Sequence, residues 1–295
     1  MVIDKILVSI AARLKIKRLL WPSHTDPAFF TKIDAWQKLK VSAPSRWSVR
    51  GLVVTERDID GYRCYELSRR ARPRAERILY IHGGAFVFPI LRAHWRFVAK
   101  LVKATGRTAV IPFYPLVPHH TYKEIHAHLK TVYLRVLETT NPDDVTVVGD
   151  SAGGNLALVL PQIVKAELHP RQIIALSPVV DLSASHPDMD RIESRDPLLP
   201  LDTIRYLLPS YYKGLDAKDS RISPLYADYR DCRSCLTLIN GGRDILSPDI
   251  TALHERLLQS GVAHNYVYEL DLPHAWPLLS LPSARKAHRY IASLL

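Results

Sequence analysis

Val145-Thr-Val-Val148 is a short apolar run that leads without a break into Gly149-Asp-Ser-Ala-Gly-Gly154, and residues 155–165 then read as a helix. Such a run is typical of a strand buried on both faces of a sheet. The turn after it matches the pattern G-x-S-x-G, in which a serine lies between a buried strand and a helix. Its glycines permit a sharp, strained bend. This context predicts that the Ser151 hydroxyl stands clear of the sheet, where it can act as a nucleophile.

The same alternation of strand and helix continues on both sides of this turn. Short apolar runs predict further strands at 52–55, 62–67, 77–81, 108–113, 173–176, 236–239 and 264–270. Helical patterns are found at 92–105, 122–138, 248–260 and 282–294. Strands that alternate with helices build a mostly parallel central sheet flanked by helices, which is an α/β fold. Residues 183–220 break the alternation, so we expect them to form an insertion above the sheet.

A serine hydroxyl needs a base before it can act as a nucleophile. In folds that carry this turn, an acid and then a histidine follow the serine along the chain. A late strand leads to Asp244, and the last predicted strand leads to His274. We predict that His274 takes the Ser151 proton and that Asp244 orients the imidazole. Asp249, at the start of a predicted helix, and Asp271, at a strand end, are the alternatives for the acid.

The loop at residues 82–85, His-Gly-Gly-Ala, follows another predicted strand. Backbone N–H groups in such a loop can stabilise the negative oxygen of a tetrahedral intermediate. Glycines allow the backbone to approach a ligand closely, because they have no Cβ. We assign the donors of this oxyanion hole to Gly83, Gly84 and Ala152.

Six stretches of the chain, together with His274, form one pattern. They are His82-Gly-Gly-Ala85, Tyr114-Pro-Leu-Val-Pro118, Gly149-Asp-Ser-Ala-Gly-Gly154, Ser177-Pro-Val-Val-Asp-Leu182, Ser223-Pro-Leu225 and Gly241-Gly-Arg-Asp244. From about residue 77 onward this pattern resembles the hormone-sensitive-lipase-like esterases, the α/β-hydrolase fold-3 group. The resemblance implies the α/β-hydrolase fold with a helical cap, and hydrolysis of short- to medium-chain acyl esters without a cofactor. The chain departs from the family where Ala85 replaces the third glycine of its HGGG motif.

The domain organisation follows from the pattern and the resemblance together. We expect residues 1–50 to contribute helices to the cap, and residues 51–295 to form the catalytic domain with a cap insertion at about 183–220. The resemblance also implies a homodimer through the edge strand 264–270.

These observations predict a serine carboxylesterase that hydrolyses a small-molecule ester through a Ser-His-Asp triad and an acyl-enzyme intermediate. An amidase or deacetylase is an alternative, because the same triad attacks amides and the leaving-group preference depends on pocket shape. A non-catalytic small-molecule receptor of the same fold is a further alternative. Relatives of that kind have lost the histidine, whereas His274 is present here.

The formal net charge of the 295 residues is +11, but the positive charges are scattered. The densest run comprises Arg69, Arg70, Arg72, Arg74 and Arg77. No nucleic-acid-binding motif accompanies them, so we interpret them as a solvated basic surface and expect no nucleic-acid partner. The three cysteines, Cys64, Cys232 and Cys235, are too few and odd in number for a disulfide framework, which favours a cytoplasmic location.

Histidines at 119, 120, 126 and 128 form a cluster, and a cluster of histidines raises the question of a metal site. His126 and His128 do not share a helix face, and no carboxylate joins them at ligand spacing. We therefore expect solvated helix histidines and no metal. Asp150, beside the nucleophile, should point away from it and have a structural role.

The first 20 residues form an amphipathic pattern. They are too short and too charged to span a bilayer, and they lack the layout of a signal peptide. Apolar residues recur at helical spacing, namely Ile3, Ile6, Leu7, Ile10 and Leu14. Such a helix can lie in a membrane interface, but more often it covers part of a core or an active-site mouth. We favour the second interpretation and expect no stable membrane insertion.

Overall fold

The computed structural model describes residues 2–39, 43–59, 61–69 and 75–295, so Arg70, Arg72 and Arg74 of the basic run lie outside the described residues. The described residues form one eight-stranded sheet in the order β1-β2-β4-β3-β5-β6-β7-β8. The strands are β1 (Val53–Ile59), β2 (Tyr62–Ser68), β3 (Arg77–Ile81), β4 (Thr108–Pro112), β5 (Val145–Asp150), β6 (Gln172–Leu176), β7 (Cys235–Arg243) and β8 (His264–Pro273). Only the pairs β1–β2 and β2–β4 are antiparallel. The predicted α/β fold with a mostly parallel sheet is therefore confirmed.

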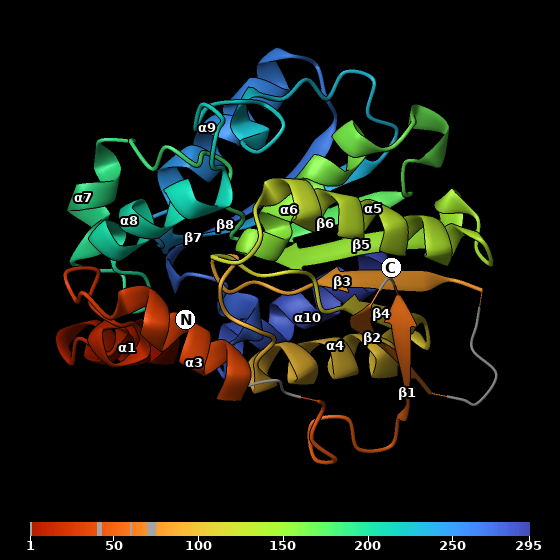
Figure 1. The fold of residues 1–295 in the computed structure, drawn as a ribbon, viewed down its shortest axis with the longest axis horizontal. Coiled ribbons are helices and arrows are strands. Elements are labelled where there is room, and N and C mark those ends of the chain that lie inside the picture. Colours follow the sequence, from red (N-terminus) through yellow and green to blue (C-terminus); the bar gives the residue numbers. More distant parts are fainter. Residues whose placement is uncertain (1, 40–42, 60, 70–74) are drawn as a thin grey trace.

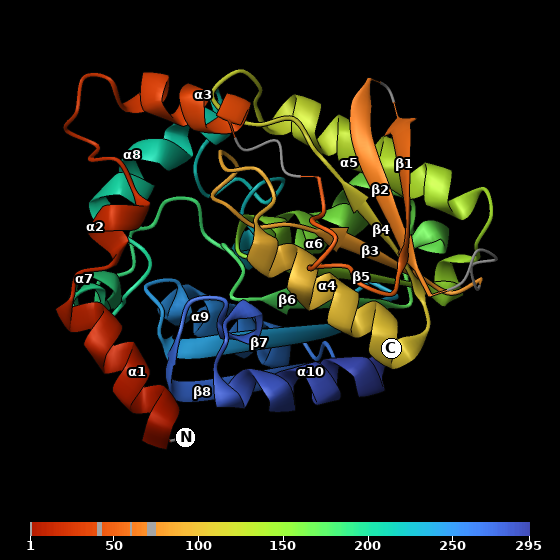
Figure 2. The ribbon, with the colours of Figure 1, turned by 90° about the horizontal axis from the view of Figure 1, so that it is seen from below.

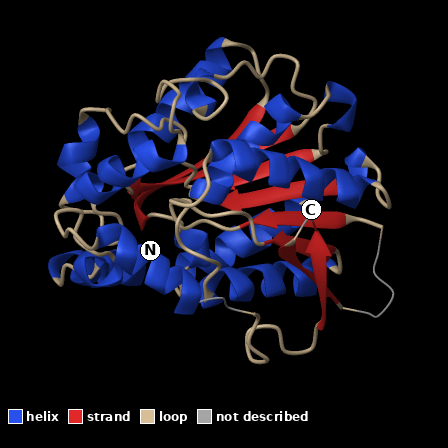
Figure 3. Cartoon of the chain, in the orientation of Figure 1, coloured by secondary structure: helices blue, strands red, loops and turns tan. Residues whose placement is uncertain are grey.

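Helices cover both faces of the sheet. Helices α4 and α10 lie on one face, and α5, α6 and α9 lie on the other (Figure 1). Figure 3 shows the same layers by secondary structure. The helices are α1 (Val2–Arg13), α2 (Lys17–Leu20), α3 (Phe29–Leu39), α4 (Arg92–Thr105), α5 (Tyr122–Leu137), α6 (Ala152–Ile163), α7 (Asp188–Glu193), α8 (Leu201–Tyr211), α9 (Ser247–Gln259) and α10 (Pro282–Leu294).

The two covered faces give the protein two hydrophobic cores. One contains Leu156 of α6 and Leu253 of α9, and the other contains Trp95 of α4 and Ile291 of α10. Every residue of the central strand β5 is buried. This explains why the sequence shows an apolar run at Val145-Thr-Val-Val148 rather than the alternation of a half-exposed strand.

The N-terminal segment and the insertion at 183–220 meet beyond the carboxyl ends of the parallel strands. Figures 1 and 2 show α1, α2 and α3 beside α7 and α8 at this end of the molecule. The Trp21 indole N–H donates to the Leu198 carbonyl over 2.9 Å, and the Lys17 ammonium donates to the Glu193 carbonyl over 2.7 Å. Two segments that are distant in sequence are thus joined beyond the carboxyl ends of the parallel strands.

Helix α6 begins earlier than the sequence pattern predicts. The prediction placed its start at Asn155, whereas the helix starts at Ala152, directly after Ser151. The Asn155 N–H already donates to the Ser151 carbonyl over 3.0 Å. The sequence pattern does not indicate this first turn, because it contains Gly153 and Gly154 and glycine is a poor helix former.

Two expectations about exposure are wrong. His126 and His128 are buried rather than solvated, and the His126 ring pairs with the Tyr211 hydroxyl at 2.8 Å. Burial lowers the pKa of His126 to about 4. The apolar face of α1, expected to cover a core or a site mouth, is instead exposed to solvent. None of the helices in the described part of the chain is long and apolar enough to cross a bilayer.

Candidate active site

Ser151 lies on a strained bend between β5 and α6. Its backbone has φ 54° and ψ −119°, and residues other than glycine rarely adopt a positive φ of this kind. The bend is tight, since a Cβ on Gly149 would lie 2.1 Å from the Gly153 carbonyl oxygen. A Cβ on Gly153 would lie 2.0 Å from the Ile81 carbonyl oxygen. Both glycines of the G-x-S-x-G pattern are therefore required by close packing of the backbone.

Asp244 and His274 lie side by side, each directly after the end of its strand. Arg243 of β7 is paired with Pro273 of β8, so the next residue of each strand emerges at the same edge. His274 Nδ1 and Asp244 Oδ2 are 2.8 Å apart, and both side chains are buried. The neighbouring Ala275 N–H donates to the Ser177 hydroxyl over 2.9 Å, which fixes the loop behind the imidazole. The hydrogen bond at Nδ1 leaves Nε2 as the nitrogen that faces away from the carboxylate.

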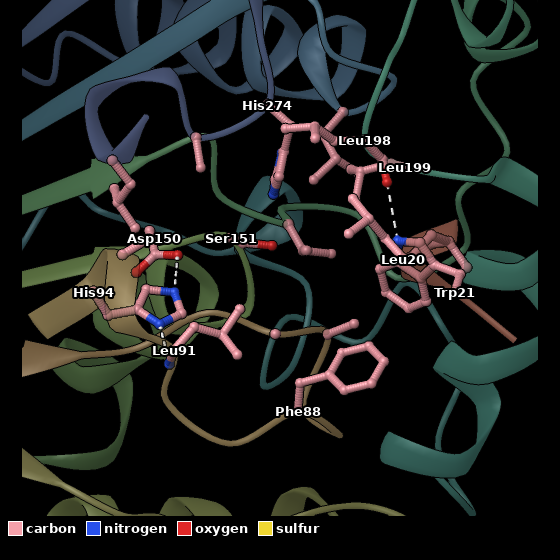
Figure 4. A pocket seen from close by; sticks show the side chains of 18 of the residues that line it. Leu20, Trp21, Phe88, Leu91, His94, Asp150, Ser151, Leu198, Leu199 and His274 are labelled. Atoms are coloured by element: carbon pink, nitrogen blue, oxygen red, sulfur yellow. Dashed lines mark hydrogen bonds and ion pairs between the residues drawn. The ribbon is translucent and has the colours of Figure 1, made fainter. Parts of the chain in front are cut away.

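Ser151 and His274 line one cavity of about 270 Å³. In Figure 4 the His274 ring points toward the Ser151 hydroxyl across this cavity. The rest of the lining is mainly apolar, and much of it comes from the N-terminal segment, the loop after β3 and the 183–220 insertion. It includes Leu20, Trp21, Trp36, Phe88, Leu198, Leu199, Ile204 and Leu208. The structure thus brings the predicted nucleophile and base to the same apolar pocket.

The loop after β3 corrects one of the predicted oxyanion donors. The Gly83 N–H donates to Asp150 Oδ1 over 3.1 Å, so it is occupied and does not face a ligand. Gly84 and Ala85 line the cavity, and both have positive φ values, 121° and 51°. Within the described residues, the N–H groups of Gly84, Ala85 and Ala152 donate to no backbone carbonyl in the turns and loops. Gly83 is therefore not available as a donor, and Ala85 is a further candidate beside Gly84 and Ala152.

Asp150 holds the loop from behind the nucleophile. Its carboxylate accepts the Tyr80 hydroxyl at 2.5 Å and lies 3.3 Å from His94 Nε2. Figure 4 shows it turned toward His94 while the Ser151 hydroxyl points toward His274. Burial alone would raise the pKa of Asp150, but His94 and Tyr80 lower it below its ordinary value. The structural role expected for Asp150 agrees with these contacts.

Asp196 is a buried carboxylate of the site that the sequence analysis did not single out. It comes from the 183–220 insertion, and its Oδ2 accepts the Ile245 N–H over 2.9 Å, one residue after Asp244. Its Oδ1 accepts the N–H groups of Leu198 and Leu199 at 2.7 and 3.0 Å. Burial, and then the charge of Asp244, raise the pKa of Asp196 to about 6. The sequence gives no sign of this contact with the Asp244 loop, because Ile245 is distant from Asp196 along the chain.

The competing acids lie elsewhere. Asp271 pairs with Arg243 at 2.9 Å and with Lys5 at 3.2 Å. Asp249 is buried in the first turn of α9, and its Oδ2 has no hydrogen-bond partner within the described residues. Burial, followed by the charge of Asp181, raises the pKa of Asp249 to about 8. Asp244 is the carboxylate that the structure places on the His274 ring.

Metal-binding and thiol groups are the other reactive groups of interest in this chain. The described residues contain no group of three or more histidine, cysteine or carboxylate side chains that could hold a metal ion. Cys64, Cys232 and Cys235 are free thiols. The groups that the cavity does present include a serine, an imidazole and apolar side chains.

A strand-bend-helix serine, a late histidine and acid, and a mostly parallel sheet between helices define the class of α/β hydrolases. Residues 78–278 match the sequence profile described as the alpha/beta hydrolase fold. The chain is 30% identical over 225 residues to an esterase of Acinetobacter venetianus, covering 73% of each protein. It is also similar to a triacylglycerol lipase of Mycobacterium tuberculosis, with 26% identity over 236 residues that cover 79% of this chain and 49% of the lipase.

A solved structure gives the same result at the level of the whole fold. A hormone-sensitive lipase from a metagenome library superposes with a TM-score of 0.82 at 26% identity, over 97% of this chain and 96% of that one. The chain belongs to the alpha/beta hydrolase fold family, among its hormone-sensitive-lipase-like members. It is a carboxylic-ester hydrolase.

Proposed function

We propose that the protein is a serine carboxylesterase whose triad is Ser151, His274 and Asp244. The observation that carries the proposal is the pair formed by His274 Nδ1 and Asp244 Oδ2 at 2.8 Å, with the ring turned toward a serine on a strained bend. An Nδ1 proton shared with the carboxylate leaves Nε2 free to accept the Ser151 proton. A serine so placed can attack an ester carbonyl bound in the apolar cavity.

The reaction we propose has two halves. The Ser151 oxygen bonds to the ester carbonyl carbon while its proton moves to His274 Nε2, and the carbonyl oxygen becomes an oxyanion. In this proposal the N–H groups of Gly84, Ala85 and Ala152 donate to that oxyanion. The C–O bond to the alcohol then breaks, and the alcohol leaves with the proton from His274. Water attacks the acyl-enzyme in the same way, which releases the acid and restores Ser151.

The charges around His274 support its role as the base. Burial lowers the pKa of the imidazole, but the charge and hydrogen bond of Asp244, followed by the charges of Asp196 and Asp150, raise it above its ordinary value overall. A raised pKa means that the surroundings stabilise the imidazolium, which is the form that His274 takes when it accepts the Ser151 proton. The carboxylates thus lower the energy of the state in which the serine oxygen attacks.

Changing Asp196 to asparagine should shift the pH dependence of the reaction. Loss of one nearby negative charge destabilises the imidazolium, so the pKa of His274 falls and the acid limb of kcat/KM moves to lower pH. The amide nitrogen of asparagine cannot accept a hydrogen bond, so at least one of the three backbone hydrogen bonds to Asp196 is lost. This loss should also lower kcat about 3- to 30-fold. The measurement is a pH profile of p-nitrophenyl butyrate hydrolysis for both proteins. A purely structural residue would lower kcat without moving the limb, and an unmoved limb would contradict the role of Asp196.

The size and lining of the cavity support short- to medium-chain acyl esters as substrates. A volume of about 270 Å³ is at the small end for ligand pockets, and the side chains around it are mostly apolar. Helix α8 supplies Ile204 and Leu208, and Trp21 and Phe88 complete the apolar walls. The N-terminal segment and the 183–220 insertion both contribute side chains to these walls, which is why we propose that they act together as the cap.

A series of p-nitrophenyl esters of increasing acyl length tests this substrate range. We expect kcat/KM to rise about 2- to 4-fold per methylene while the chain still fits, and then to fall. Ile204→Phe should move the optimum to shorter chains, whereas Leu258→Ala, on the exposed side of α9, should leave it in place. A p-nitroanilide of the best acyl group tests the amidase alternative. Faster cleavage of the anilide than of the ester would overturn the proposed specificity.

A further inference from the structure

Helix α1 is oriented with its apolar face outward. Ile3 and Ile6 are 62% and 52% exposed, Leu7 and Ile10 on the same face are exposed as well, and Leu14, directly after the helix, is 67% exposed. These residues follow one another at the spacing of a single helix face. In a surface helix of a globular protein this face would normally be turned to the core. Here it forms a contiguous apolar surface, which marks an interaction site.

Polar contacts hold α1 in this orientation. The buried Asp4 carboxylate accepts the Ser283 hydroxyl of α10 at 2.6 Å. The Arg243 guanidinium donates to the Ser9 hydroxyl over 2.7 Å, and Lys5 pairs with Asp271 at 3.2 Å. Because the inner face is fixed by directed hydrogen bonds, rotating the helix to bury its apolar face would break them. The outward orientation is thus built into the packing of α1 on β8 and α10.

The charges near the apolar face favour one kind of partner over another. Asp4 is the single acidic residue among residues 1–20, and it is buried, whereas the basic residues are Lys5, Arg13, Lys15, Lys17 and Arg18. Arg13, Lys15 and Arg18 are exposed, and the whole chain carries a formal charge of +11. A second copy of this face would bring like charges together. An anionic lipid surface offers both apolar chains for the isoleucines and negative headgroups for the cations.

The apolar face continues toward the substrate cavity. Leu14 is followed by α2, where Leu19 is 82% exposed and Leu20 both is exposed and lines the cavity, next to Trp21. We propose that α1 and α2 bind the surface of an anionic lipid membrane through this face, with the cavity next to the bound region. The binding stands apart from the proposed triad, but delivery of membrane-dissolved esters to Ser151 rests on the proposed function.

Vesicle co-sedimentation of the full chain tests the binding. We expect the protein to sediment with phosphatidylcholine vesicles that contain phosphatidylglycerol, and about tenfold less with pure phosphatidylcholine or in high salt. The double variant Ile6→Glu/Ile10→Glu should lose binding to the anionic vesicles about tenfold or more. The matched variant Leu134→Glu/Leu258→Glu, which places the same charges on exposed positions of α5 and α9, should bind as the parent does.

Two further measurements keep this test independent of the proposed catalysis. Hydrolysis of dissolved p-nitrophenyl acetate should be unchanged in Ile6→Glu/Ile10→Glu, which shows that the variant is folded. Vesicle binding should also persist in Ser151→Ala, so a failure of the triad would leave it intact. Recovery of the parent in the supernatant with every vesicle would overturn the proposal. So would sedimentation velocity showing a dimer that Ile6→Glu/Ile10→Glu converts to a monomer, because a second copy would then cover the face.

Discussion

Ser151→Ala is expected to reduce kcat for p-nitrophenyl butyrate by ~10³-fold or more while the protein remains folded. The substitution removes the one oxygen that can bond to the acyl carbon at the bend between β5 and α6, and it leaves the cavity and His274 in place. Alanine keeps the Cβ that the backbone at φ 54° already accommodates, so the bend itself is not disturbed. The measurement is the steady-state rate at saturating ester, with circular dichroism to confirm the fold.

A covalent probe separates loss of the nucleophile from loss of binding. Phenylmethylsulfonyl fluoride should place one adduct on the peptide that carries Ser151 in the parent protein, and none in Ser151→Ala. Ser260→Ala, an exposed serine after α9, serves as the control and should keep both the adduct and the rate. Residual activity within about tenfold of the parent would show that another group is the nucleophile.

The strand pattern was predictable because the physical signal is local. β3, β5 and β6 are covered on both faces, so they appear in the sequence as uninterrupted apolar runs. The ends of β7 and β8 were less predictable. β7 continues through Gly241 and Gly242 to Arg243, since it pairs there with β8 despite the low strand propensity of glycine. That extension carries Asp244 and His274 to the same edge.

The parts of the site that sequence reasoning missed depend on contacts between distant segments. Asp196 accepts the N–H of Ile245, and the Gly83 N–H is occupied by the Asp150 carboxylate, a pairing that no local pattern reveals. The orientation of α1 was predicted wrongly for a related reason. Periodicity locates an apolar face but not the side from which the rest of the protein contacts it, and here Asp4 and Ser9 make those contacts.

The choice of acid has the second large expected effect. Asp244→Asn should lower kcat by ~10²- to 10⁴-fold with little change in the fold. The carboxylate accepts a hydrogen bond from His274 Nδ1 at 2.8 Å, whereas an asparagine amide can donate to that nitrogen and favour the tautomer protonated at Nε2. In that tautomer the imidazole cannot take the Ser151 proton. The pKa of His274 also falls, because Asp244 is the carboxylate that raises it most.

Asp249→Asn and Asp271→Asn are the matched controls, since each makes the same chemical change at one of the alternative acids. Asp271 is engaged by Arg243 and Lys5, and Asp249 has a pKa raised to about 8, so it is largely protonated at neutral pH and asparagine resembles it. Both variants should keep kcat within about threefold of the parent, because neither carboxylate contacts the imidazole. A loss of ~10²-fold or more in Asp249→Asn, with Asp244→Asn near the parent rate, would reassign the acid. The same carboxylate would then have to reach His274 by a movement of α9, and the pair observed at 2.8 Å would be a structural contact rather than part of the triad.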